Sequence, residues 1–186
     1  MRVSREQFLE NREKILQAAS RLFRERGFEE VGVADVMKAA GLTHGGFYGH
    51  FKSKDDLIAQ ATGGVAQSFI DLWEGIVAAE GPQALQAIGE RYLGDAHLCA
   101  TGAGCQIAAL GPEIARRSPE DRAAVTEGVK RLVEVLEKAA PGATEADRRK
   151  RALQAYAGWV GAVVLARISD DEAFSREVRE AVAEEG

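Results

Sequence analysis

One stretch of the sequence, Val33–Lys54, decides the fold and reads VADVMKAAGLTHGGFYGHFKSK. Its apolar spacing predicts a short helix from about Val33 to Ala40. Gly41 can adopt the positive φ of a sharp turn, and Thr43 can cap a second short helix that ends near His50. A helix, a glycine turn and a second helix at this spacing are typical of a helix-turn-helix.

The second short helix has two different sides. Phe47 and Phe51 are four residues apart and lie on one side, which we expect to face a core. A helix that enters the major groove presents small or hydrogen-bonding side chains at its N-terminal end, where its dipole also favours phosphate. Hydroxyl, imidazole and ammonium groups beyond this end can hold the phosphate backbone. The candidate DNA-binding residues are therefore Thr43, His44, Gly45, Gly46, Tyr48, His50, Lys52 and Lys54. An alternative for His50 is a local structural role beside Phe51.

Helices are predicted on both sides of this stretch. Before it, Ser4 can cap a helix that Gly27 ends; its apolar side holds Phe8, Ile15, Ala18, Ala19, Leu22 and Phe23. After it, Ser53 can cap a longer helix that continues through Ile76, with Asp55 and Asp56 in the first turn, where the helix dipole favours negative charge. We therefore expect a three-helix N-terminal domain joined to the rest of the chain by a long helix.

The remaining sequence also predicts helices. The expected segments run from Pro82 to about Leu98, from Pro119 to about Ala139, from Thr144 to Ile168 and, as a last short helix, from beyond Asp170. No stretch alternates as a strand would. The sequence thus predicts an all-α fold. We place the domain division inside the long helix, with a helix-turn-helix domain at 1–54 and a helical domain at 55–186 that form one rigid body.

Composition indicates an ordinary globular protein, and although the negative net charge argues superficially against nucleic acid, the charge is divided unevenly along the chain. The chain has 186 residues, of which 46% are hydrophobic and 28% charged, and a net charge of −5. Residues 1–54 hold ten Lys or Arg against seven Asp or Glu, or +3, whereas residues 55–186 hold 14 against 22, or −8. The longest apolar run, Tyr156–Ala166, is shorter than the roughly 18 to 20 residues of a membrane span. Because no secretory signal is visible at the N-terminus, we expect a cytoplasmic protein without a membrane partner.

The few residues that could support other chemistry give weak signals. His97, Cys99 and Cys105 are types that ligate metals, but they form no Cys-x-x-Cys pair, and we expect no metal and no cofactor. A redox- or metal-responsive regulator remains the alternative function. A helical enzyme is less favoured, since two of the three histidines lie in the proposed DNA-binding segment and no nucleophile with a base can be named. We therefore expect no enzyme.

A family resemblance makes this interpretation more specific. Residues Ala39–Leu57, AAGLTHGGFYGHFKSKDDL, resemble the signature of the TetR family of repressors, and the similarity extends over about 8–60. The resemblance implies DNA contacts from Thr43, His44, Gly45 and Tyr48, and phosphate contacts from His50 and Lys54. It also implies a repressor that leaves a pseudo-palindromic, double-stranded operator when a small-molecule effector binds. The chain departs from the family pattern at Gly32, His44 and Gly49.

For the C-terminal domain, the resemblance implies a ligand cavity and a homodimer built from two helices of each subunit. Aromatic residues mixed with a few polar groups are typical of small-molecule sites, and the candidate pocket residues are Phe69, Trp73, Tyr92, Cys105, Gln106, Leu110 and Trp159. The two helices that begin at Pro119 and Thr144 carry apolar stripes, which give the candidate dimer residues Val125, Val129, Leu132, Leu136, Tyr156, Trp159, Val160 and Val163. Packing within one chain would produce the same stripes.

Overall fold

The computed structural model describes residues 4–183, apart from the side chains of residues 64–66, and every regular element in that range is a helix. The predicted all-α fold is confirmed. The α-helices are α1 (Arg5–Glu30), α2 (Val33–Ala39), α3 (Lys54–Glu80), α4 (Ala84–Leu93), α5 (Asp95–Cys99), α6 (Gln106–Ile114), α7 (Pro119–Ala139), α8 (Glu145–Ile168) and α9 (Glu172–Ala183). Three short 3₁₀ helices are η1 (His44–Gly49), η2 (Gly81–Gln83) and η3 (Thr101–Ala103).

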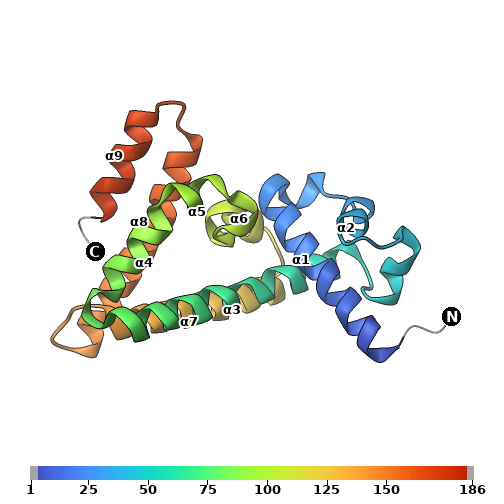
Figure 1. The fold of residues 1–186 in the computed structure, drawn as a ribbon, viewed down its shortest axis with the longest axis horizontal. Coiled ribbons are helices and arrows are strands. Elements are labelled where there is room, and N and C mark those ends of the chain that lie inside the picture. The colour runs from blue at the N-terminus through green and yellow to red at the C-terminus, as the bar shows by residue number, and fades with distance from the viewer. Residues whose placement is uncertain (1–3, 184–186) are drawn as a thin grey trace.

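Helix α3 connects the two ends of the molecule (Figure 1). The first helices, α1, α2 and η1, gather at one end, and α3 leaves them to run alongside α7. Helices α4, α8 and α9 lie at the other end, and α6 lies between the two groups (Figure 1). Within the described residues, no helix is long and apolar enough to cross a membrane.

The predicted helix starts are confirmed by their caps. The hydroxyl oxygens of Ser4, Ser53, Ser118 and Thr144 each accept a hydrogen bond from the backbone N–H three residues later. These bonds satisfy amide groups that have no partner inside the helix. Local polar residues therefore fix where α1, α3, α7 and α8 begin.

Three predicted helices differ in detail, and glycine explains each difference. At Gly27, φ is +83°, so α1 kinks there and continues to Glu30 instead of ending. The second short helix is the 3₁₀ helix η1, which has three glycines among its six residues; this composition disfavours a regular α-helix. The helix expected from Pro82 to Leu98 is divided into α4 and α5 at Gly94, whose backbone is extended.

The described residues form two hydrophobic cores. One surrounds Trp73, Tyr92 and Trp159 and joins α3, α4, α7 and α8. The other contains Phe23, Phe47 and Phe51 together with residues from the first turns of α3 and from α6. The boundary predicted near residue 55 therefore crosses this second core, because Leu57, Leu110 and Ile114 complete the packing of the N-terminal helices.

Candidate nucleic-acid interface and ligand cavity

The helix-turn-helix consists of α2, a turn at Gly41 and η1. Gly41 has φ +71°, as its place in the turn predicted, and the N–H of Leu42 closes the turn by donating to the carbonyl of Met37 at 2.9 Å. Phe47 is fully buried and Phe51 nearly so, and their rings stack with centroids 5.7 Å apart. This pair fixes η1 on the N-terminal core, as predicted.

The opposite side of η1 is exposed. Tyr48 has 70% of its surface exposed. Thr43, His44, Gly45 and Gly46 are exposed too. Thr43 occupies the N-cap position, but its side chain accepts no capping hydrogen bond, contrary to expectation. The structure thus brings the first five candidate DNA-binding residues together on one accessible edge.

His50 has a structural role. Its ring stacks on Phe8 with centroids 4.3 Å apart, and its carbonyl accepts a hydrogen bond from Nη1 of Arg12 at 2.7 Å. Burial, together with the nearby positive charge of Arg12, lowers the pKa of His50. The imidazole therefore packs against α1, which agrees with the alternative role; its contact with phosphate stays a prediction.

The cationic residues next to η1 differ in freedom. Lys52 is exposed, whereas Lys54 is half-buried with Nζ 3.4 Å from the carbonyl oxygen of Glu29. Arg12 was not predicted: its guanidinium lies 4.5 Å from the centroid of the Phe51 ring and also contacts Gln60. The sequence gives no local sign of this role, because Arg12 is one of several charged residues on its helix. Its partner His50 lies 38 residues later in the chain.

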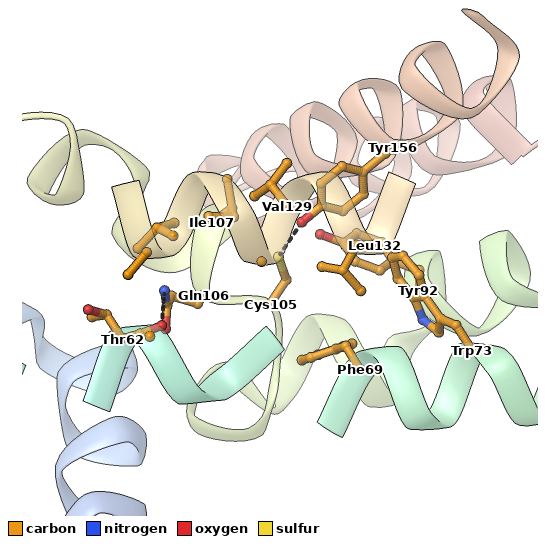
Figure 2. A pocket seen from close by; sticks show the side chains of 14 residues that line it. Thr62, Phe69, Trp73, Tyr92, Cys105, Gln106, Ile107, Val129, Leu132 and Tyr156 are labelled. Carbon is orange, nitrogen blue, oxygen red and sulfur yellow. Dashed lines mark hydrogen bonds between the residues drawn. The ribbon is translucent and has the colours of Figure 1, made fainter. Parts of the chain in front are cut away.

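A small inner cavity lies between α3, α4, α6, α7 and α8 (Figure 2). Its volume is about 30 Å³, room for one or two water molecules. Five of the seven candidate pocket residues line it, namely Phe69, Trp73, Tyr92, Cys105 and Gln106. Residues not assigned to the pocket from the sequence complete the wall: Thr62, Gly63, Ile107, Ala124, Val125, Gly128, Val129, Leu132 and Tyr156.

The other two candidate pocket residues lie elsewhere. Leu110 belongs to the N-terminal core, because α6 turns that side chain away from the cavity and toward α1. Trp159 is 1% exposed and packs against Gly89, where a Cβ atom would lie 2.9 Å from the indole ring. Both residues are large apolar groups in helices that also carry true lining residues, so the sequence pattern did not separate them.

The polar groups of the inner cavity are arranged around Cys105. Its thiol sulfur lies 3.8 Å from the hydroxyl oxygen of Tyr156 (Figure 2). Its backbone N–H donates to Nε2 of His97 at 2.8 Å, and Nδ1 of His97 lies 2.6 Å from the carbonyl oxygen of Tyr92. Since Nε2 accepts, Nδ1 carries the proton and the ring is neutral. Burial and the charge of Arg167 lower the pKa of His97, in agreement with this state.

At the other end of the inner cavity, Gln106 donates through Nε2 to the carbonyl oxygen of Thr62 at 3.1 Å (Figure 2).

The three residues considered as a metal site, His97, Cys99 and Cys105, do not form one. Cys99 is exposed and Cys105 is buried. In the described part of the chain, no group of three or more His, Cys, Asp or Glu is placed to hold a metal ion.

A larger outer groove adjoins the inner cavity. Its volume is about 330 Å³, and it shares Phe69, Trp73 and Tyr92 with the inner cavity. Its remaining wall includes Arg24, Arg91 and His97. A single layer of aromatic side chains therefore separates the two spaces, and Phe69, which is only partly buried, belongs to that layer.

The residues predicted for the dimer interface lie mainly inside one chain. Leu132, Leu136, Tyr156, Trp159 and Val163 are all buried in the C-terminal core. Val125, Val129 and Val160 are partly buried and pack against the cores. The five buried side chains are covered by their own chain and offer little surface to a partner, whereas a dimer contact of Val125, Val129 and Val160 stays a prediction. The large apolar side chains exposed on α8 and α9 are Leu153, Leu165, Ile168 and Phe174.

Known proteins resemble this chain in both sequence and fold. The sequence model of the family described as "Bacterial regulatory proteins, tetR family" matches residues 15–61, which include the helix-turn-helix. The HTH-type transcriptional regulator AcrR of Shigella flexneri is 39% identical over 59 residues, 32% of this chain and 27% of that protein. The HTH-type transcriptional repressor NemR of Escherichia coli K12 is 26% identical over 170 residues, 86% of this chain and 85% of NemR.

Solved structures extend the likeness to the whole fold. The crystal structure of the reduced form of E. coli NemR aligns with a TM-score of 0.76 at 22% identity, covering 94% of this chain and 96% of that one. A TetR-family transcriptional regulator from Agrobacterium tumefaciens aligns with a TM-score of 0.77, also at 22% identity, covering 95% and 97% of the two chains. By sequence, residues 15–61 match the TetR family of bacterial regulatory proteins, and the whole chain shares the fold of a TetR-family transcriptional regulator.

Proposed function

We propose that this protein is a homodimeric transcriptional repressor. One η1 from each subunit enters a half-site of a pseudo-palindromic operator in double-stranded DNA, and a small molecule bound in the C-terminal domain releases the dimer. The observation that carries the proposal is the exposed edge of η1. Tyr48, which is 70% exposed, lies on this edge beside small polar residues, while the buried side chain of Phe47 anchors η1 to the N-terminal core.

The direct test is DNA binding at several salt concentrations. A DNA fragment from the promoter region of the protein's own locus is titrated with the dimer, and complex formation is followed by fluorescence anisotropy. If the interface contacts about six phosphates, affinity is expected to fall about 10³-fold between 50 and 200 mM salt, because bound Lys and Arg groups release counterions. Absence of binding at low salt, or an affinity that salt does not change, would contradict the proposal.

For the dimer we propose a surface on α8 and α9. Leu153, Leu165 and Ile168 lie on α8 and Phe174 on α9, and all four are exposed in the single chain. Ala157 and Gly161, also exposed, lie between the leucines at four-residue spacing, so the apolar stripe follows one side of α8. A second copy that covers this stripe would remove it from water.

Helix α6 offers a physical connection between the cavity and the DNA-binding helices. Gln106, in its first turn, lines the inner cavity, whereas Ile114, at its other end, packs in the N-terminal core. Nine residues of α-helix span about 13 Å. Near the same end, a carboxylate oxygen of Glu113 accepts a hydrogen bond from the N–H of Phe28 at 2.7 Å. We propose that a ligand acts through α6 as well as through the long helix α3.

The hydrogen bond of Glu113 allows the connection between α6 and α1 to be measured as a change in stability. Glu113→Ala leaves the N–H of Phe28 without its acceptor, and we expect the free energy of unfolding to fall by about 1–3 kcal/mol. Glu113→Gln keeps a neutral acceptor and should lose less. Urea denaturation measures both variants, with Glu134→Ala, an exposed position on α7, as the control. Wild-type stability of Glu113→Ala would show that the bond does not join α6 to α1.

A redox-responsive regulator is the second candidate, favoured by the position of Cys105. Its thiol lines the inner cavity and lies 3.8 Å from the hydroxyl oxygen of Tyr156. Cys105 also directly precedes α6, so oxidation or modification of the sulfur would change the packing at the start of that helix. Operator binding measured with and without dithiothreitol separates the two candidates, because the small-molecule mechanism needs no thiol chemistry.

A further inference from the structure

The inner cavity contains a buried donor that has no acceptor. Tyr92 is 3% exposed, and among the described residues its hydroxyl group has no hydrogen-bond partner. The neighbouring hydroxyl of Tyr156 contacts the Cys105 thiol at 3.8 Å, a weak interaction, since sulfur is a poor hydrogen-bonding group. Buried polar groups are normally paired, so an unpaired phenol facing a cavity indicates that the missing partner comes from outside the chain.

Both phenols act as donors. Burial, followed by the proximity of Cys105, raises the pKa of Tyr92 and of Tyr156 well above the ordinary value. The two hydroxyl groups therefore keep their protons at neutral pH. Each can donate one hydrogen bond to an acceptor that lies between them. The side chains of Trp73, Leu132 and Val129 surround this position with apolar surface (Figure 2).

The inner cavity is poorly suited to a charged group. None of the described residues that line it is charged, and burying an unpaired ion in such surroundings is costly. Arg24, in the outer groove, is already engaged: its Nε donates to the carbonyl oxygen of Gly102 at 2.8 Å and its Nη1 to the hydroxyl of Ser20 at 2.7 Å. Arg167 lies near Tyr92 and Cys105 but does not line the inner cavity, and its Nε and Nη2 donate to the carbonyl oxygens of Leu98 and His97. An anion in the inner cavity would therefore have no counter-ion among the described lining residues.

We propose that this site takes a small, uncharged, largely apolar molecule that carries one carbonyl-type oxygen, with that oxygen accepting hydrogen bonds from Tyr92 and Tyr156. The inner cavity of about 30 Å³ accommodates the oxygen end, and the outer groove of about 330 Å³ accommodates the apolar body. Phe69 belongs to the layer between the two spaces, so displacement of its ring joins them. This assignment rests on the proposed function, because it names the chemical class of the small molecule that would release the dimer from DNA.

Three probes of similar size test the assignment on the wild-type dimer without DNA. Acetophenone has the required oxygen, α-methylstyrene has nearly the same shape without it, and benzoate is an anion. Calorimetry is expected to show acetophenone binding about tenfold more tightly than α-methylstyrene, the ratio that corresponds to about 1.4 kcal/mol, and benzoate binding more weakly than acetophenone. Equal affinity for the first two probes, tighter binding of benzoate, or no binding of any probe at millimolar concentration would overturn the assignment.

The variant Tyr92→Phe distinguishes a binding role from a purely structural one. Because the hydroxyl has no partner in the unliganded protein, its removal should leave the melting temperature unchanged or raise it by a few degrees. The same change should lower the affinity for acetophenone about three- to tenfold and leave that for α-methylstyrene unchanged. A lower melting temperature with unchanged acetophenone affinity would overturn the assignment. Operator binding by the unliganded variant is measured separately, so failure of the ligand class and failure of DNA binding are distinguishable.

Discussion

Tyr48→Ala is expected to weaken operator binding by about 5- to 150-fold, or roughly 1–3 kcal/mol, while the protein keeps its fold and its dimer. Tyr48 contributes little to the N-terminal core, because most of its surface is exposed; its ring meets Phe47 edge-on, with centroids 5.2 Å apart. The loss of affinity therefore reports the contact with DNA. Anisotropy titrations of an operator fragment at one fixed salt concentration measure it.

Tyr48→Phe is the matched control. It keeps the ring and its contact with Phe47 but removes the hydroxyl that can donate to a phosphate oxygen. If ring and hydroxyl both contribute, Tyr48→Phe should lose part of the affinity and Tyr48→Ala the whole amount. Circular dichroism verifies that the helices remain. Wild-type operator affinity in a folded Tyr48→Ala dimer would exclude this residue from the interface.

The N-terminal architecture could be predicted because its signals are local. A capping serine lies at the start of α1 and another at the start of α3, and Gly41 adopts the positive φ that the turn requires. Phe47 and Phe51 are both apolar at four-residue spacing and both buried. Whether η1 would be an α-helix or a 3₁₀ helix was less predictable. Three glycines in six residues weaken helix formation, whereas the packing of the two phenylalanine rings stabilises the segment.

The C-terminal site could be predicted only in part, because burial against the same chain and burial against a partner or ligand produce the same apolar pattern. Trp159 illustrates the difficulty: its place is determined by Gly89, on α4, which alone leaves room for the indole. Tyr156 was assigned to the dimer but lines the cavity. These outcomes depend on which helices meet in space, and the spacing within one helix does not contain that information.

The dimer surface proposed on α8 and α9 leads to the prediction with the largest expected effect. Leu165→Glu places a charge on the exposed stripe of α8, at a position where 46% of the leucine surface is accessible in one chain. In the single subunit the new carboxylate stays in water, so the fold should be retained. In the proposed dimer it would be buried without a partner, which costs several kcal/mol. At about 3 kcal/mol, the dissociation constant of the dimer rises more than 100-fold.

Trp159→Glu is expected to behave differently, because Trp159 is buried among α3, α4 and α8 of its own chain. A carboxylate at that position should unfold the C-terminal domain rather than produce a folded monomer. Gln154→Glu is the control for charge alone, since Gln154 is exposed on α8 next to Leu153. That variant should remain dimeric. Circular dichroism and light scattering together separate loss of the fold from loss of the dimer.

Operator binding then follows from the oligomeric state. A folded Leu165→Glu monomer presents one η1 and can occupy only one half-site, so it loses the simultaneous contact that makes a dimer bind tightly. Its operator affinity should fall much more than that of Tyr48→Ala, although its own DNA-binding residues are intact. A folded Leu165→Glu protein that remains a dimer would place the partner on another face, and a monomeric wild-type protein would contradict the two-half-site mechanism itself.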